Sequence, residues 1–254
     1  MTAHSSKAPV IAAIIPARYA STRFPGKPLV KIAGVTMIER VYRQAKKCRL
    51  VTRVIVATDD DRIAEVVRGF GGEVAMTRGD HATGTDRLAE VAERLTDIDI
   101  IVNIQGDEPL IDPESVDSVV TPLLESSVQM ATASRLLTNP AEIESPQVVK
   151  VVVGQDKNAL YFSRFPLPFY RDATDISDQV HFGHIGLYVY TRECLLKISK
   201  LAPTPLEKAE CLEQLRALEN GIKISVVQFK TQALAVDVPE DVEKIESALK
   251  LLSI

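Results

Sequence analysis

The chain has 254 residues, of which 46% are hydrophobic and 25% charged, and its formal net charge is −4. These proportions are typical of a folded globular protein and exclude disordered, collagen-like and disulfide-scaffold classes. Because the charge balance is acidic and Trp is absent, we expect no nucleic-acid partner. No apolar run approaches the ~20 residues of a membrane span, and the three scattered cysteines fit a reducing compartment. We therefore expect a cytoplasmic protein with no membrane partner.

Apolar runs and helical patterns alternate along the first half of the chain. Strands are expected at 10–15, 53–58, 73–76 and 99–104, and helices at 36–48, 61–70, 85–95 and from about 112. Asp60 is placed to cap the second of these helices, because an Asp side chain accepts hydrogen bonds from the free N–H groups of a first turn. The alternation predicts an α/β fold in which helices cover both faces of a parallel sheet.

The second half of the chain is richer in strands. Further strands are expected at 130–137, 148–153, 159–164, 185–190, 223–229 and 233–236, and helices at 191–200, 205–219 and near the C-terminus. Because few helices separate the strands, a smaller lobe of antiparallel strands is predicted within about 130–230. Residues 1–9 are expected to form a flexible tail, and residues 10–254 a single domain.

The loop after the first strand, PARYASTRFPGKP at 16–28, carries Arg18, Arg23 and Lys27 between small residues. A guanidinium group can bind two phosphate oxygens, and a lysine supplies a mobile positive charge, so the loop suits a polyphosphate. The Walker A pattern is missing from it. A solvated basic surface loop is the alternative interpretation.

Two acidic residues each follow an apolar run. Asp107 lies in QGDEP at 105–109, and Asp237 lies in VDVPED at 236–241. Open parallel sheets bind ligands at the carboxyl ends of their strands, and Mg²⁺ prefers carboxylate and phosphate oxygens. Both residues are therefore candidate metal ligands. A tight turn is the alternative for QGDEP, and a helix cap is the alternative for Asp237.

Polar side chains also gather in HFGHIGLYVY at 181–190 and in PLEKAECLEQLR at 205–216. Two histidines stand three residues apart in the first segment, but no cysteine or carboxylate completes a recognisable metal-ligand spacing. Structural histidines and a solvated helix face are the alternatives to a binding role for these segments.

The chain resembles the 3-deoxy-manno-octulosonate (Kdo) cytidylyltransferase family in seven segments that occur in order over about residues 10–250: IIPARYASTRFPGKPL, TRGDHATGTDRLAE, NIQGDEPLI, YFSRFPLPF, HIGLYVY, PLEKAECLEQLRALENG and VDVPEDVEKI. The resemblance implies a Rossmann-like nucleotide-diphospho-sugar transferase fold, with a mostly parallel central sheet and a smaller dimerisation lobe. It also implies an enzyme that joins Kdo to the CMP part of CTP, releases diphosphate and serves lipopolysaccharide synthesis.

The same resemblance implies roles for individual residues. The implied nucleotide-binding residues are Pro16, Ala17, Arg18, Arg23, Lys27, Arg78, Thr83, Gln105 and Asp107. The implied sugar-binding residues are Arg164, His184, Tyr188, Glu213 and Gln214. Asp107 and Asp237 are the implied Mg²⁺ ligands, and together with Lys27 and Arg23 they form the implied catalytic set. The implied partners are CTP and Kdo as substrates, and a second copy of the chain in a homodimer.

In such a reaction the anomeric hydroxyl of Kdo attacks the α-phosphorus of CTP in line. The step needs positioning and charge stabilisation rather than a covalent nucleophile. Sialic acid and 8-amino-Kdo are alternative acceptors, although sialic-acid enzymes usually continue with a Gly-Ser-Lys type sequence where this chain has YASTRFPGKPL. A non-enzymatic nucleotide-binding regulator on the same fold is the alternative from another class. Four charged residues of this chain argue against a non-enzymatic regulator: Lys27, Asp107, Arg164 and Asp237.

Overall fold

The structure, a computed structural model, describes residues 8–20, 24–81, 83–172, 179–230 and 234–251. The strands are β1 (Ile11–Ala17), β2 (Lys31–Ile32), β3 (Val35–Thr36), β4 (Arg53–Thr58), β5 (Glu73–Met76), β6 (Ile100–Asn103), β7 (Met130–Leu137), β8 (Lys150–Val153), β9 (Ala159–Ser163), β10 (His181–Thr191) and β11 (Ile224–Phe229). The helices are α1 (Met37–Ala45), α2 (Asp61–Gly69), α3 (Gly84–Arg94), α4 (Pro113–Glu125), α5 (Pro140–Glu144), α6 (Arg192–Ile198), α7 (Pro205–Glu210), α8 (Gln214–Glu219), α9 (Asp241–Leu251) and the 3₁₀ turn η1 (Lys27–Leu29).

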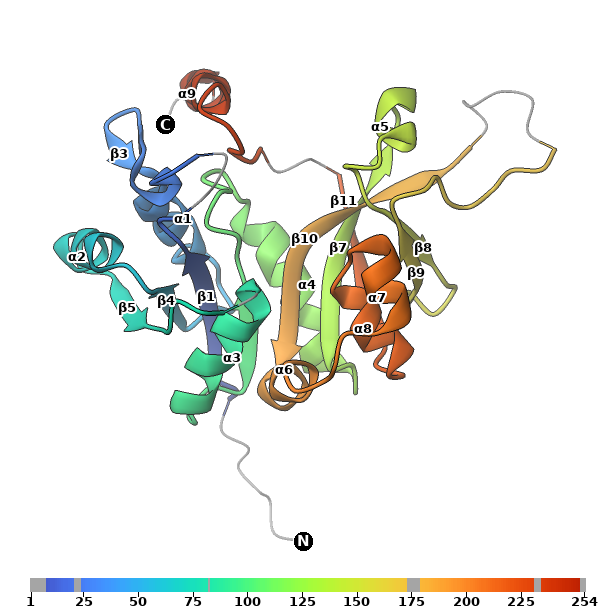
Figure 1. Cartoon of the computed structure of the whole chain (residues 1–254), viewed down its shortest axis with the longest axis horizontal. Helices are drawn as coiled ribbons and strands as arrows, with labels where there is room; N and C mark the ends of the chain where they lie inside the picture. The colour runs from blue at the N-terminus through green and yellow to red at the C-terminus, as the bar shows by residue number, and fades with distance from the viewer. Residues whose placement is uncertain (1–7, 21–23, 82, 173–178, 231–233, 252–254) are drawn as a thin grey trace, which may run out of the picture.

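A nine-stranded sheet runs through the centre of the molecule (Figure 1), in the order β11-β7-β10-β6-β1-β4-β5, with β8 and β9 attached beside β10. The strands β6, β1, β4 and β5 pair in parallel, and β11 pairs in parallel with β7. Along this path of described strands, β10 is the one that runs in the opposite direction, because it is antiparallel to both β6 and β7. The prediction of an α/β fold with a mainly parallel central sheet is therefore confirmed.

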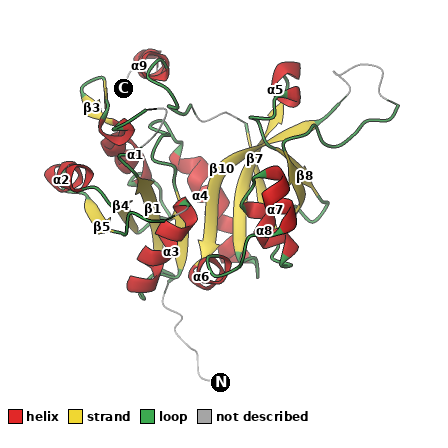
Figure 2. Cartoon of the chain, viewed as in Figure 1, coloured by secondary structure: helices red, strands yellow, loops and turns green. Residues whose placement is uncertain are grey.

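Helices cover both faces of the sheet (Figure 2). Ile11, Ala13 and Ile15 of β1 join one buried cluster with residues of α1, α2 and α4, whereas Ala12 and Ile14 join a second cluster with residues of α3, α6 and α8. None of these five side chains is more than 3% exposed. Burial on both faces is the reason that the strand is a continuous apolar run rather than an alternating one.

An arm projects from the sheet at the right of Figure 1. We define the arm as the described part of residues 136–183, which includes α5, β8, β9 and the outer ends of β7 and β10. β8 pairs with β10 at Lys150 and Gly183, and with β9 along its length. The arm falls within the range in which a smaller lobe is predicted, whereas β11 and the inner parts of β7 and β10 belong to the central sheet.

The predicted strand at 233–236 is wrong for its described residues. Val236 donates a backbone hydrogen bond to Asp107 O at 2.9 Å, but residues 234–238 do not join the sheet. The Val236 side chain is instead buried with Ile32 of β2 and with Ile245 and Leu249 of α9. Val236 is buried while residues 234, 235, 237 and 238 are exposed, so the apolar run here reflects local packing rather than a strand.

The predicted helix at 205–219 is also wrong, because it is broken into α7 and α8. Cys211, directly after α7, has φ 52°, which lies in the left-handed region that L-residues rarely adopt. The break frees the carbonyls of Glu210 and Cys211, and both accept hydrogen bonds from the side chain of Arg164. The turn therefore exchanges helical bonds for contacts with the arm.

The two ends of the chain lie on opposite sides of the molecule (Figure 1). α9 packs beside the β2–β3 hairpin, where Glu246 accepts a hydrogen bond from Ala33 N at 2.7 Å. Of the predicted tail, residues 1–7 lie outside the described residues. No helix within the described ranges has the length and apolar character needed to cross a membrane.

Candidate active site

The loop after β1 brings Gly26 back to the described residues that directly follow that strand. The chain returns at Gly26, whose N–H donates to Tyr19 O at 2.9 Å. Gly26 has φ +71°, and a Cβ there would lie 3.2 Å from the Tyr19 ring, so the return requires glycine. η1 then begins at Lys27 and places that side chain beside the end of β6. Arg23, predicted in this loop, lies outside the described residues.

The amine of Lys27 lies among oxygen atoms from distant parts of the chain. It donates to Asp107 Oδ2 at 2.7 Å and to Val236 O at 3.0 Å, and Asp237 Oδ1 lies 4.0 Å away. Asp107 follows β6, whereas Asp237 belongs to the segment before α9. The fold thus brings the two predicted acidic residues to one lysine, although the described residues directly before Asp237 form no strand.

A cavity of about 420 Å³ opens at this edge of the sheet, and we name it the nucleotide cavity. Its lining contains most of the predicted nucleotide-binding residues: Pro16, Ala17, Arg18, Lys27, Gln105 and Asp107. Arg18 Nη2 is buried and has no hydrogen-bond partner among the described residues. Buried donors of this kind are costly unless they bind something, so an anionic oxygen in the cavity would complement Arg18.

Gly106 lies between Gln105 and Asp107 in the turn after β6. A Cβ at this position would lie 2.9 Å from Pro16 O, which is closer than real Cβ atoms approach a carbonyl. The glycine therefore allows the 105–109 turn to pass against the end of β1. This close packing of chain against chain, rather than against a ligand, is what places Gln105 and Asp107 beside Arg18 in one cavity.

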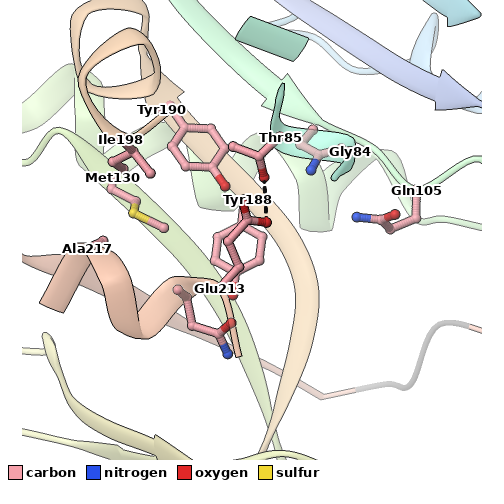
Figure 3. Close-up of a pocket in the computed structure, with 11 residues that line it drawn as sticks. Gly84, Thr85, Gln105, Met130, Tyr188, Tyr190, Ile198, Glu213 and Ala217 are labelled. Atoms are coloured by element: carbon pink, nitrogen blue, oxygen red, sulfur yellow. Dashed lines mark hydrogen bonds between the residues drawn. The ribbon is translucent and has the colours of Figure 1, made fainter. Parts of the chain in front are cut away.

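A second cavity, of about 170 Å³, adjoins the first through Gly84 and Gln105 and is shown in Figure 3. We name it the acceptor cavity. Three predicted sugar-binding residues line it: Tyr188, Glu213 and Gln214. Tyr188 comes from β10, directly after a shift in the β7–β10 register, and the other two come from the turn before α8 and its first residue. The three predicted sugar-binding side chains therefore come from the interior of a strand, from a turn and from the start of a helix.

Glu213 joins the acceptor cavity to the loop that leads into α3. Its carboxylate accepts from Thr85 Oγ1 at 2.9 Å, the dashed line in Figure 3, and from Thr83 Oγ1 at 3.2 Å. Burial raises the pKa of Glu213, and the Thr85 hydroxyl offsets part of that increase. Thr83, a predicted cytosine or ribose contact, also caps α3 by accepting from Asp86 N. Its hydroxyl therefore positions Glu213 and the helix.

His184 lines a third cavity, of about 320 Å³, with Glu108 and Arg135. Its ring lies 3.0 Å from Thr132 Oγ1, and burial lowers the pKa of His184 to about 4. At neutral pH the imidazole is therefore uncharged. Glu108, next to Asp107, is 9% exposed, and burial, followed by the Asp107 charge, raises its pKa to about 7.

Two predicted site residues are not in the lining of the nucleotide cavity or the acceptor cavity. Arg78 lies beside α3, where its side chain is 3.7 Å from Asp80 and 3.9 Å from Glu90, and it lines a separate surface groove. Arg164 lies at the end of β9 and donates to carbonyls at the α7–α8 turn. His181 donates from Nδ1 to Leu167 O at 2.8 Å, and its Nε2 lies 3.0 Å from Gln179 Oε1, which is the structural alternative for that residue.

Several residues of the site are absent from the predicted set. Asn103 lies in the acceptor cavity at the end of β6, and its buried Oδ1 has no hydrogen-bond partner in the part of the chain that the structure describes. Thr85 and Tyr190 line the same cavity. A polar residue that ends a buried apolar strand, as Asn103 does, is a signal in the sequence that could have identified it.

Known proteins similar to this chain agree on one family. Residues 12–224 match the sequence signature of the cytidylyltransferase family. The 3-deoxy-manno-octulosonate cytidylyltransferase of Geobacter sulfurreducens is 53% identical over 249 residues, which cover 94% of this chain and 99% of that protein. Its counterpart from Geobacter metallireducens is 52% identical over 253 residues, or 96% and 99% of the two chains. A solved structure of CMP:2-keto-3-deoxy-manno-octonic acid synthetase complexed with CTP superposes with a TM-score of 0.90 at 41% identity, and covers 96% of this chain and 100% of the other.

Proposed function

This chain belongs to the 3-deoxy-manno-octulosonate cytidylyltransferase family, and we propose that it transfers the cytidylyl group of CTP to Kdo and releases diphosphate, for lipopolysaccharide synthesis. The observation that carries the proposal is the pair of adjoining cavities at the carboxyl edge of the sheet. One holds the basic and acidic side chains that suit a triphosphate, and the other holds polar groups that suit a hydroxylated sugar.

Lys27 and Arg18 bind the phosphate oxygens of CTP in this proposal. A charge-assisted hydrogen bond from either cation stabilises the negative charge on those oxygens. Pro16, Ala17 and Gly84 form the wall nearest to the base. Gln105, whose amide donates to Gly186 O at 3.1 Å, spans the boundary between the two cavities, which suits a residue placed where the two substrates meet.

We propose Mg²⁺ as the cofactor, held by Asp107 and Asp237. These residues fit a cation such as Mg²⁺, because oxygen atoms of both carboxylates and of Val236 already surround one positive charge, the Lys27 amine. Among the described residues, no three His, Cys, Asp or Glu side chains converge as a complete metal site. Mg²⁺ commonly uses one or two carboxylates together with substrate phosphates. When bound, it would supply charge stabilisation at the phosphate oxygens.

The acceptor cavity receives the sugar in this proposal. Tyr188, Glu213 and Gln214 offer hydrogen-bonding groups for hydroxyls. His184 lines the third cavity, and its ring centroid lies 5.3 Å from that of Tyr188. Because burial keeps it neutral at physiological pH, it can donate or accept without adding charge. Arg164 supplies the positive charge that suits the carboxylate of a sugar acid.

We further propose that two copies of the chain associate through the arm. Large apolar side chains are exposed there: Leu136, Leu160, Phe165, Phe169 and Val180. Phe165 and Phe169 are 73% and 84% exposed, and apolar patches of this kind mark interaction surfaces. A second copy would cover them. A cytoplasmic location is also proposed, supported by the unpaired thiols of Cys48, Cys194 and Cys211.

The test of the function is diphosphate release from CTP with three acceptors: Kdo, 8-amino-Kdo and sialic acid. We expect turnover with Kdo, dependent on Mg²⁺, and little with sialic acid. A preference for sialic acid would overturn the assignment of the acceptor. Analytical ultracentrifugation of the purified chain, alongside a Phe169→Glu variant, tests the dimer, since a charge on the arm should shift the parent dimer toward monomer.

A further inference from the structure

Lys150 is a fully buried cation that the proposed reaction does not use. Lys150 is 0% exposed, although it lies in the short strand β8 of the arm. An unpaired buried ammonium group is very costly. The surroundings of Lys150 must therefore compensate for the water that it has lost.

The compensation comes from carbonyl oxygens. Lys150 Nζ donates to Ser145 O at 2.9 Å, to Val148 O at 2.7 Å and to Arg164 O at 2.6 Å. Three acceptors match the three N–H bonds of an ammonium group, whereas a neutral amine has only two. Lys150 therefore joins the segment before β8 to the backbone of Arg164, and does so in its charged form.

Glu210, the last residue of α7, holds the other side of the same backbone. Its carboxylate accepts from Arg164 N at 2.9 Å and from Ser163 Oγ at 2.6 Å. Arg164 is thus fixed at its N–H by Glu210 and at its carbonyl by Lys150. One contact comes from α7 and the other from β8.

The guanidinium of Arg164 is held by carbonyls alone among the described residues. It donates from Nε to Glu210 O at 2.8 Å, from Nη1 to Pro146 O at 2.9 Å and from Nη2 to Cys211 O at 3.3 Å. A guanidinium has five N–H bonds, so each Nη atom keeps one that these contacts do not use. No carboxylate of the described residues forms an ion pair with Arg164.

We propose that Lys150 and Glu210 are positioning residues that hold Arg164 as the reader of the acceptor's carboxylate. The inference rests on the proposed function for the identity of the acceptor. Lys150 and Arg164 contribute two positive charges, and Glu210 one negative charge. The cluster therefore keeps one positive charge in excess, which an incoming carboxylate neutralises. Because carbonyls fix the orientation of Arg164 without neutralising it, the guanidinium is oriented in advance and remains available to an anion.

The experiment compares Kdo with its C1 methyl ester as acceptors in Lys150→Met and Glu210→Gln variants of the full chain. For the parent, we expect a large preference for the acid. In each variant we expect the KM for Kdo to rise about tenfold or more, since bonds to charged groups are involved, while the KM for CTP changes by less than about twofold. Use of the ester should change little, so the acid-to-ester ratio of kcat/KM should fall about tenfold.

Two controls separate positioning from general stability. Lys223→Met removes an exposed lysine, and Glu219→Gln disturbs the contact between α7 and α8 through Leu206 N without touching Arg164. Both should keep the parental acid-to-ester ratio. If Lys150→Met fails to bind CTP in calorimetry, it has not folded, and Glu210→Gln then carries the test. An equal loss for acid and ester in Glu210→Gln would overturn the proposal.

The outcome with the parent chain distinguishes this inference from the proposed function. If the parent releases diphosphate with another 2-keto sugar acid but not with Kdo, the proposed acceptor is wrong, and the positioning is tested with that acid and its ester. If the parent uses its acceptor and the ester of that acceptor equally well, the carboxylate is not read, and the inference is overturned although the function stands.

Discussion

The nucleotide side of the site takes its side chains from loops that directly follow parallel strands, whereas the acceptor side takes them from places where regular backbone is interrupted. Arg18 follows β1 and Gln105 follows β6, and both line the nucleotide cavity. On the acceptor side, Tyr188 follows a register shift in β10, and Glu213 follows the left-handed residue Cys211.

This difference shows two ways of assembling a site. The carboxyl ends of parallel strands lie at the same edge of the sheet, so the loops that follow them are neighbours and need no other contact to bring them together. An interrupted strand or helix releases backbone groups that must find partners elsewhere. At the α7–α8 turn the partner is Arg164, so the interruption itself links the arm to the acceptor cavity.

The strongest test of the nucleotide side is removal of its acidic group. Asp107→Asn should reduce turnover by about 10³-fold, because the loss affects charge stabilisation in the transition state, and should weaken Mg²⁺-dependent binding of CTP. Asp237→Asn should reduce turnover comparably while largely sparing CTP binding, since that residue lies farther from Lys27. Calorimetric titration of CTP with Mg²⁺, beside turnover assays, distinguishes the two variants. A fully active Asp237→Asn enzyme would reduce that residue to a structural role.

Lys27→Ala tests whether the basic loop contacts phosphate. The variant loses a charge-assisted hydrogen bond, so kcat/KM for CTP should fall about 10–100-fold, whereas the KM for Kdo should change little. Lys31→Ala is the matched control, because Lys31 is an exposed lysine of the neighbouring strand β2. Equal behaviour of the two variants would mean that the loop is only a solvated surface.

The pH dependence of stability tests the burial of His184. Below about pH 6.5 the unfolded chain binds a proton at a histidine, but the folded protein binds it at His184 only near pH 4. The contribution of His184 to the free energy of unfolding should therefore fall as pH drops through this window, by about 1–3 kcal/mol. Glu108, whose pKa is raised to about 7, contributes in the opposite direction, so the comparison of parent and variant isolates His184. Urea denaturation at pH 7 and pH 4.5 measures the loss, and His184→Gln should reduce it. An unchanged pH dependence in the variant would contradict this account of His184.

The smallest expected effect concerns the return of the loop after β1. Gly26→Ala places a side chain at φ +71° beside Tyr19 and should destabilise the protein by about 1–2 kcal/mol. Gly34→Ala has a similar φ of +80° but no atom within 4 Å of the new Cβ, so it separates backbone strain from crowding. Thermal denaturation measures both. A rise in the KM for CTP is expected for Gly26→Ala alone, because only that loop positions Lys27.

The sequence by itself determined most of the nucleotide side. Burial on both faces of β1 forces a continuous apolar run, and the polar loops that follow such runs are visible in the chain. Asp60 caps α2 as predicted, with its carboxylate accepting from Arg62 N at 3.0 Å. The residue-level roles in the site followed from resemblance and stay predictions.

The tertiary structure alone decided what meets across long distances. Periodicity reports whether a side chain is buried but not which partner buries it, so the spacing around Val236 suggested a strand where there is only packing against Ile32 and α9. Nothing in the local pattern of β8 marks Lys150 as a buried cation, because its three compensating groups are backbone carbonyls, and one of them belongs to Arg164 beyond β9. Hydrogen bonds between distant segments depend on the folded backbone, and only that backbone turned Arg164 toward the α7–α8 turn.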